Sequence, residues 1–380
     1  MSATKESQGK QRLRDALRSD FQDADLKSSM QRDLREMKEF FLSEDEKQRL
    51  ERMSPFYKLF YIPFWITRAM MLRLTPLRRI LLLIGAVLLL FVHDSGQSGL
   101  GGAQLVGALL FLFVLLLELK DKILARDELE AGRAVQIALM PDERPVFRGW
   151  DLYLYTHPAN DVGGDLVDYI YVNEDRLGLS LGDVAGKGLG AALFMAKLQA
   201  TLRAIAPGRA SIRDFGAQLS EIFDRDGLPN RFASLVYLEI TKDSGEVTLL
   251  NAGHMPPLIA RKGAVEEMPR GGPALGLLLH RNYEEQCVVL EHDDVLLVFS
   301  DGVTEARNAQ GEFFGDIRLK KLLERYASMS AAELGALILD RVSSFSAGSP
   351  QHDDLSLMII RRANSAPTTP ASTDTASSQA

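Results

Sequence analysis

The sequence predicts an α+β domain with antiparallel sheets, preceded by a helical and partly apolar N-terminal region. Between residues 145 and 362, strand-like runs follow one another directly, separated at hairpin distance by turn sequences such as Asp243-Ser244-Gly245. Helical patterns come in pairs, at 190–205 with 211–223 and at 317–326 with 331–344. Strands next to strands, with the helices grouped, are typical of α+β folds rather than of repeated βαβ units.

Length and composition restrict the protein class. The 380 residues suffice for about two domains with connecting segments. Lys and Arg number 44 against 51 Asp and Glu, and the net charge of −7 gives no long-range attraction for nucleic acid, so we expect no nucleic-acid partner. A single cysteine, Cys287, excludes an internal disulfide and a zinc site made of cysteines.

Residues 1–73 are expected to form a charged helical N-terminal region. Apolar residues recur at helical spacing as one stripe at Leu26, Met30, Leu34, Met37 and Phe41. This stripe fits a solvated helical arm, and a helix that docks on a partner is the alternative. Residues 56–76 mix apolar and aromatic side chains with three basic ones, which favours a segment at the membrane interface.

Two uncharged apolar runs follow and predict a transmembrane hairpin over residues 74–117. A membrane-spanning helix needs about 20 apolar residues. The run 95–117 has 23 uncharged residues and meets this need. The run 80–92 has 13 residues and reaches the length only if 74–77 are included and Arg78 and Arg79 extend to the headgroups. Whether residues 77–92 cross the membrane therefore stays open, and a buried hairpin in a soluble domain is the alternative.

Flanking charge predicts the orientation of this hairpin. Basic residues lie outside both of its ends, at Arg68, Arg73, Lys120, Lys122 and Arg126, whereas the link at 93–99 has no Lys or Arg. The positive-inside rule places both ends in the cytoplasm. Residues 118–140 are good helix formers without a clean heptad and predict a linker helix that Pro141 ends. Residues 363–380, rich in Ser, Thr, Ala and Pro, predict a disordered tail.

Aspartates in the C-terminal domain lie repeatedly beside glycines at the ends of apolar strands. Asp165 follows two glycines before a strand, Asp183 and Asp301 each follow a strand, and Asp353-Asp354 precede one. Any single case is more often a turn. Four cases in one domain, with little histidine and one cysteine, indicate an all-oxygen site that suits Mg²⁺ or Mn²⁺ rather than zinc.

The segment 182–188 resembles a P-loop only superficially. It has three residues between the first glycine and Gly-Lys instead of four, and Gly188 stands where Ser or Thr is required. The segment nevertheless ends a strand and opens a helix. Backbone N–H groups at this helix start, with Lys187 and Gly188, are therefore candidates for holding a phosphate.

Five motifs together resemble a known family. They are Val162-Gly163-Gly164-Asp165, Gly182-Asp183-Val184-Ala185-Gly186-Lys187-Gly188, Asn251-Ala252-Gly253-His254-Met255-Pro256-Pro257, Ser300-Asp301-Gly302-Val303-Thr304-Glu305-Ala306-Arg307 and Asp353-Asp354-Leu355-Ser356. In this order they are similar to the motifs of the SpoIIE-like, RsbU-type branch of the PPM metal-dependent serine/threonine phosphatases. The resemblance covers about residues 120–362 and implies, for 141–362, a sandwich of two antiparallel sheets flanked by helices.

The resemblance also implies roles for individual residues. Two divalent ions, Mn²⁺ or Mg²⁺, are implied, with Asp165, Asp183, Asp301 and Asp353 as the catalytic carboxylates that bind them. Asp183 is expected to bridge the ions, and the carbonyl of Val184 matches a further ligand position. Asp354 ranks below Asp353, because its position is often an amide in the wider superfamily. Ala185 stands where many members have a histidine, which leaves the general acid unassigned.

The implied function is that of a membrane-anchored protein phosphatase. It would hydrolyse phosphoserine or phosphothreonine by attack of a metal-bridging hydroxide, and the implied substrate is a STAS-type anti-sigma-factor antagonist in a bacterial partner-switching pathway. The expected location is the bacterial inner membrane, as a multi-pass protein in contact with lipid, with the N-terminus and the phosphatase domain in the cytoplasm. A homodimer formed through the linker helix is also expected. The alternatives are a catalytically silent scaffold that signals through partner binding, and another two-metal enzyme such as a nuclease or cyclase.

Overall fold

A computed structural model of the chain describes residues 42, 44–51, 53–90, 101–209, 211–226, 231–278 and 283–363. The apolar stripe expected before residue 42 and residues 364–380 of the tail expected at 363–380 lie outside this description. The chain divides into two compact units, Met1–Ile123 and Leu124–Ala380. The boundary falls inside the expected linker segment, 118–140. It also lies within one continuous helix, α6 (Gly102–Leu139).

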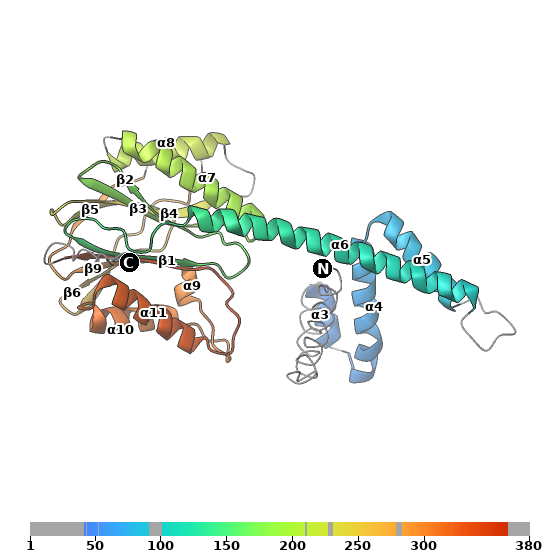
Figure 1. Cartoon of the computed structure of the whole chain (residues 1–380). Helices are drawn as coiled ribbons and strands as arrows, with labels where there is room; N and C mark the ends of the chain where they lie inside the picture. The colour runs from blue at the N-terminus through green and yellow to red at the C-terminus, as the bar shows by residue number, and fades with distance from the viewer. Residues whose placement is uncertain are drawn as a thin grey trace, which may run out of the picture. The chain divides into compact units, whose positions relative to one another are not determined.

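The described part of the N-terminal unit is helical. It contains α3 (Glu44–Glu51), α4 (Pro55–Arg73), α5 (Pro76–Leu90) and the first part of α6 (Figure 1). Pro55 and Pro76 each stand at the start of a helix, where a missing backbone N–H costs nothing. The aromatic side chains of Phe56, Phe60 and Phe64 on α4 are 61–68% exposed.

Helices α5 and α6 pack against each other through glycines. A Cβ atom on Gly107 would lie 2.8 Å from the carbonyl oxygen of Gly85, so only glycine permits this approach. On the same pair of helices, Arg78 donates hydrogen bonds to Glu118 (2.7 Å) and Asp121 (2.5 Å). The expected hairpin therefore exists as a helix pair.

The length of the two helices bears on the expected membrane span. Among the described helices, α6 and the segment Leu189–Gly208 are long and apolar enough to cross a bilayer, and half of the latter's most apolar stretch is buried in the C-terminal unit. In the corresponding stretch of α6 only 11% is buried. Helix α5 has 15 residues, or about 22 Å at 1.5 Å per residue, against about 30 Å of hydrocarbon. The first span therefore remains a prediction.

The C-terminal unit is a sandwich of two five-stranded sheets in which all described pairings between strands are antiparallel. One sheet has the order β1 (Trp150–His157), β10 (Leu355–Arg362), β9 (Val295–Phe299), β6 (Leu258–Arg261) and β7 (Ala264–Glu267). The other has the order β2 (Leu166–Tyr171), β3 (Arg176–Val184), β4 (Ala233–Thr241), β5 (Glu246–Ala252) and β8 (Gln286–Val289). This architecture confirms the predicted fold class.

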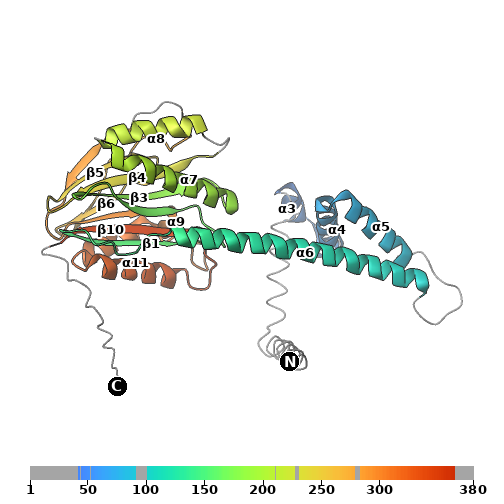
Figure 2. The ribbon, with the colours of Figure 1, turned by 45° about the horizontal axis from the view of Figure 1, so that its top comes forward.

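Helices cover the outer face of each sheet (Figures 1 and 2). Those over the β2–β8 sheet are α7 (Leu189–Ile205) and α8 (Ile212–Asp226), joined by a short 3₁₀ turn, Ala206–Gly208. Those beside the β1–β7 sheet are α9 (Asp301–Thr304), α10 (Gly315–Tyr326) and α11 (Ala331–Phe345).

Alternate apolar side chains of the strands fill the space between the sheets, including Leu154, Leu179, Val236, Val298 and Met358. The opposite strand faces pack against the helices, which explains why the strands read as nearly continuous apolar runs. Figure 2 shows the two sheets between their helical layers.

Candidate active site

The predicted aspartates come from both sheets. Asp165 directly precedes β2 and Asp183 lies near the end of β3, whereas Asp301 follows β9 and Asp353 precedes β10. The negative charges of Asp301 and Asp353 raise the pKa of Asp183, and the charge of Asp183 raises the pKa of Asp165. Such effects require that the carboxylates lie near one another. The structure thus brings four carboxylates that are distant in the sequence to one place.

The pKa values of Asp165, Asp183 and Asp301 are raised. Burial raises the pKa of Asp165 well above its usual range, and the neighbouring charge of Asp183 adds to the rise. Burial, followed by the charges of Asp301 and Asp353, raises the pKa of Asp183 to about 6. Burial raises the pKa of Asp301 as well, with Asp353 as the next cause. Each shift means that the charged form is disfavoured in the protein alone, so a cation at this place would be favourable.

Two observations show that the donors fit divalent ions. The Oδ2 atom of Asp165 is buried and has no hydrogen-bond partner among the described residues. A Cβ atom on Gly164 would lie 3.1 Å from the carbonyl oxygen of Val184 and 3.6 Å from Oδ1 of Asp183, so the glycine keeps space beside both oxygens. Carboxylate and carbonyl oxygens are the ligands that Mg²⁺ and Mn²⁺ prefer.

The cluster is not a closed coordination shell. Within the described ranges, no three His, Cys, Asp or Glu side chains enclose a position for one ion. Carbonyl oxygens and water would have to complete the coordination, as is usual for Mg²⁺, which keeps several of its waters. Asp353 illustrates the openness, because its side chain is 49% exposed.

Asp354 has a different environment from Asp353. Its side chain is buried, and both of its oxygens accept backbone hydrogen bonds: Oδ1 from Ala159 (2.8 Å), and Oδ2 from Gly164 (2.6 Å) and Asp165 (3.3 Å). These contacts hold the loop before β2, and they leave Asp354 less available as a ligand than Asp353.

Lys187, the candidate phosphate-binding residue, lies at the edge of the cluster. Its Nζ donates to the carbonyl oxygen of His352 (2.8 Å) and lies 3.8 Å from Oδ2 of Asp353. Gly188 is the N-cap of α7 with φ of 74°, a conformation that suits glycine. Their expected role in holding a phosphate remains a prediction.

His254 and Asp168 have structural contacts. The ring of His254 lies 2.8 Å from the hydroxyl of Ser234 through Nδ1 and 3.1 Å from the carbonyl oxygen of Phe299 through Nε2. Burial lowers its pKa to about 4, so the ring stays neutral near pH 7. Asp168 is fully buried and accepts two hydrogen bonds of 2.7 Å from the guanidinium of Arg203 on α7.

Two further residues, Arg231 and Gln136, hold loops of the site, although no sequence motif indicates them. Arg231 donates to the carbonyl oxygen of Ala185 (2.9 Å) and lies against Gly186 and Gly190, so it holds the loop after Asp183. Gln136 on α6 binds the loop that contains Asp165. Neither belongs to a local motif, because each acts across a long sequence separation.

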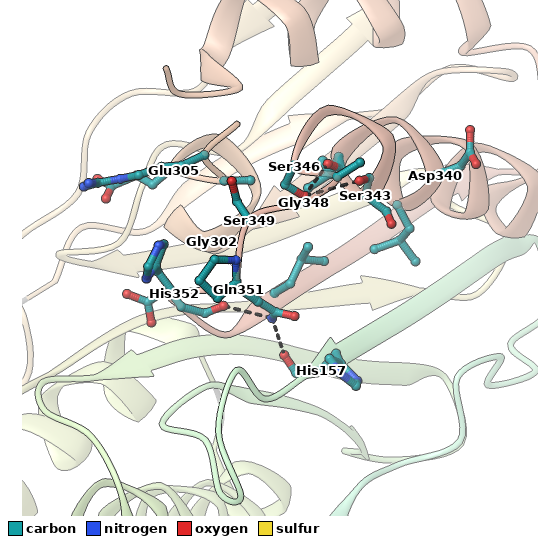
Figure 3. Close-up of a pocket in the computed structure, with 18 of the residues that line it drawn as sticks. His157, Gly302, Glu305, Asp340, Ser343, Ser346, Gly348, Ser349, Gln351 and His352 are labelled. Atoms are coloured by element: carbon teal, nitrogen blue, oxygen red, sulfur yellow. Dashed lines mark hydrogen bonds between the residues drawn. The ribbon is translucent and has the colours of Figure 1, made fainter. Parts of the chain in front are cut away.

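A polar cavity of about 820 Å³ opens beside the carboxylates. Residues of β1, α9, α11 and the loop before β10 line it, and Lys187, Gly302 and Asp353 stand where it meets the cluster. Figure 3 shows Gln351 in this loop, where its side-chain amide donates to the carbonyl oxygens of His157 (3.3 Å) and Asp353 (2.9 Å). The cavity thus offers room for a substrate larger than a phosphate group.

The sandwich and its motifs define a PP2C-type phosphatase domain. The family model for stage II sporulation protein E (SpoIIE) matches residues 173–363, half of the chain. The chain belongs to the SpoIIE family, and PPM/PP2C phosphatases as a class are metal-dependent.

Two curated relatives are similar to this chain. The phosphoserine phosphatase RsbU of Bacillus subtilis is 26% identical over 239 residues, which cover 62% of this chain and 70% of RsbU. Protein IcfG of Synechocystis is 30% identical over 274 residues, which cover 64% of this chain and 43% of IcfG. The chain therefore spans less than half the length of IcfG.

Solved structures show the same fold. The RsbU and RsbW domains of Rv1364c from Mycobacterium tuberculosis match with a TM-score of 0.52 and 25% identity, covering 60% of this chain and 63% of that one. The SiaA-PP2C domain of Pseudomonas aeruginosa matches with a TM-score of 0.54 and 19% identity, covering 64% of this chain and 98% of that one. The second match bears on the fold alone.

Proposed function

We propose that this protein is a metal-dependent protein phosphatase that hydrolyses phosphoserine or phosphothreonine. The observation that carries the proposal is the cluster of Asp165, Asp183, Asp301 and Asp353 at strand ends of both sheets, whose oxygen donors fit divalent cations. These carboxylates and the carbonyl of Val184 would hold two Mn²⁺ or Mg²⁺ ions. Such ions activate water and neutralise phosphoryl oxygens.

The chain's own residues contribute positioning. Asp354 and Arg231 hold the loops on either side of the cluster, so that Asp165 and Asp183 are presented on a fixed backbone. The polar cavity beside Asp353 would receive the polypeptide around the phosphorylated residue. His254 is excluded as a proton donor near neutral pH, because its ring is buried, neutral and engaged at both nitrogens. The general acid thus remains unassigned.

The partner and location belong to the same proposal. Similarity to RsbU supports a phosphorylated regulatory protein as substrate, and we propose a STAS-type antagonist in a partner-switching pathway. The apolar length of α6 supports anchoring in the inner membrane by residues 74–117, with both ends cytoplasmic. Leu119 and Ile123 lie one turn apart on α6 and are each about half exposed, which supports homodimer formation through residues 118–140.

Turnover of a phosphoserine peptide by the full chain in detergent tests the proposal. We expect phosphate release with Mn²⁺ and none with excess EDTA. Loss of an outer-shell partner in a metal site costs about 10–100-fold, so Asp301→Asn, which removes a proposed ligand, should cost about 100-fold or more. Asp340→Asn is the matched control, because Asp340 lines the same cavity from α11 outside the cluster. Equal turnover in both variants would contradict the assignment.

A further inference from the structure

Gln136 on α6 makes a reciprocal amide pair with a backbone residue of the candidate active site. Its Nε2 donates to the carbonyl oxygen of Gly163 at 3.0 Å, and its Oε1 accepts from the N–H of Gly163 at 3.0 Å. The side chain is only 4% exposed. One side chain thus satisfies both backbone groups of a residue that lies two positions before Asp165.

The next two residues of this loop are held by Asp354. That carboxylate accepts from the N–H groups of Gly164 and Asp165, and a Cβ atom on Gly163 would lie 2.5 Å from its Oδ2. The loop is therefore enclosed between Gln136 and Asp354. Because residues 163 and 164 are both glycines, the backbone has little conformational restriction of its own, and these two side chains supply it.

Helix α6 is in close contact with the domain at this point. One turn before Gln136, a Cβ atom on Gly132 would lie 3.0 Å from a methyl carbon of Leu189 on α7 and 3.9 Å from Val162. Gln199 of α7 donates to the carbonyl oxygen of Leu139 at 2.8 Å and fixes the helix end separately. The helix thus reaches the Asp165 loop through Gln136 and reaches α7 through other residues.

We propose that Gln136 is a positioning residue that sets Asp165 for metal binding by fixing the backbone of Gly163. The expected effect on metal affinity rests on the proposed function, whereas the anchoring of the loop does not. Without the reciprocal pair, the loop loses its contact with α6, while the Asp354 contacts and the hydrogen bonds of Ser356 and Ser300 to the Asp165 side chain remain, so the backbone before Asp165 becomes less fixed. Outer-shell contacts of this kind change metal affinity by about 10–100-fold.

Matched methionine variants of the full chain in detergent test this inference. Met has nearly the length and shape of Gln but cannot form the amide pair. Gln136→Met should weaken Mn²⁺ binding by about 10–100-fold and speed amide exchange in residues 160–168 of the metal-free protein. The value of kcat at saturating Mn²⁺ should largely recover. The control is Gln199→Met, because Gln199 is equally buried and contacts the end of α6 at Leu139. This variant should change Mn²⁺ affinity and the amide exchange of residues 160–168 by less than about 2-fold.

The two measurements separate this inference from the proposed function. Unchanged exchange of residues 160–168 in Gln136→Met overturns the inference, whatever the activity. Equal effects in Gln136→Met and Gln199→Met also overturn it, because they would indicate a general disturbance of the helix end. Failure of the unaltered protein to bind Mn²⁺ overturns the proposed function and the expected effect on metal affinity, while faster exchange would still establish the anchor.

Discussion

Replacing Asp183 by asparagine should stabilise the metal-free protein while abolishing metal binding. Burial and neighbouring carboxylates raise the pKa of Asp183 from 3.8 to about 6. That gap of about two units corresponds to about 3 kcal/mol of unfavourable free energy for the charged form in the folded state. Because the carboxylate is incompletely buried, screening reduces this value, and we expect a gain of about 1–2 kcal/mol for the neutral isostere.

The gain should depend on pH in a defined direction. The folded-state pKa of Asp183 lies above its unfolded value, so the folded state binds the proton more tightly. The destabilisation is therefore absent below about pH 4, grows as the pH rises from about 4 to 6, and is complete above about pH 7. The advantage of Asp183→Asn should follow the same course.

Thermal unfolding of the full chain in EDTA measures this effect. For a domain of about 200 residues, 1 kcal/mol shifts Tm by about 2–4 °C, so Asp183→Asn should raise the Tm of the C-terminal transition by about 2–8 °C at pH 7.5. The shift should vanish near pH 4. With Mn²⁺ at 100 times its Kd, the order should reverse, because only the unaltered protein gains about 2.7 kcal/mol from binding.

Asp168→Asn is the matched control. Asp168 is a fully buried carboxylate of the same domain, but Arg203 neutralises it through two hydrogen bonds of 2.7 Å. Removing one partner of such a pair destabilises a protein, so this variant should lower Tm at pH 7.5 with or without metal. A lower Tm for Asp183→Asn in EDTA at pH 7.5, or a gain that is the same at pH 4 and pH 7.5, would refute the reasoning.

Two further predictions concern other parts of the molecule. His254→Ala should cost about 2 kcal/mol of stability in denaturant unfolding, because it leaves buried partners unsatisfied. The pH–rate profile between pH 6 and 8 should keep its shape, because the pKa of His254 is already lowered to about 4, and a lost inflection near pH 6 would argue for a catalytic histidine. In a Cys287→Ser background, a cysteine at position 95 should react with an impermeant thiol reagent in intact cells, whereas one at position 7 should not. Labelling at position 7 would contradict the proposed hairpin topology.

The sequence predicts most of the phosphatase fold, because local pattern and tertiary burial agree there. Strands such as β1, at Trp150–His157, coincide with runs that are apolar on both faces, and such runs occur where a strand lies between a second sheet and a helical layer. The short helix α9 is not predicted, because four residues carry no helical period and its start depends on the strand before it.

The candidate site is predicted only in part. The Gly-Asp signals predict the carboxylates, and the resemblance ranks Asp354 below Asp353. The local pattern alone does not distinguish the two, since successive residues point in opposite directions and the fold decides which one contacts the loop before β2. Gln136 gives no signal, because a buried glutamine on a helix without a clean heptad looks like a surface residue. Its partner Gly163 is 27 residues away.

The most direct test of the central claim is an electron paramagnetic resonance titration of free Mn²⁺ with the full chain. The account predicts that the unaltered protein removes Mn²⁺ from solution and that Asp183→Asn and Asp353→Asn each bind far less. Asp340→Asn, which alters a carboxylate of the same cavity outside the cluster, should bind as the unaltered protein does. Equal binding by all four proteins, or no binding by the unaltered protein, would contradict the claim that this carboxylate cluster is the metal centre of a phosphatase.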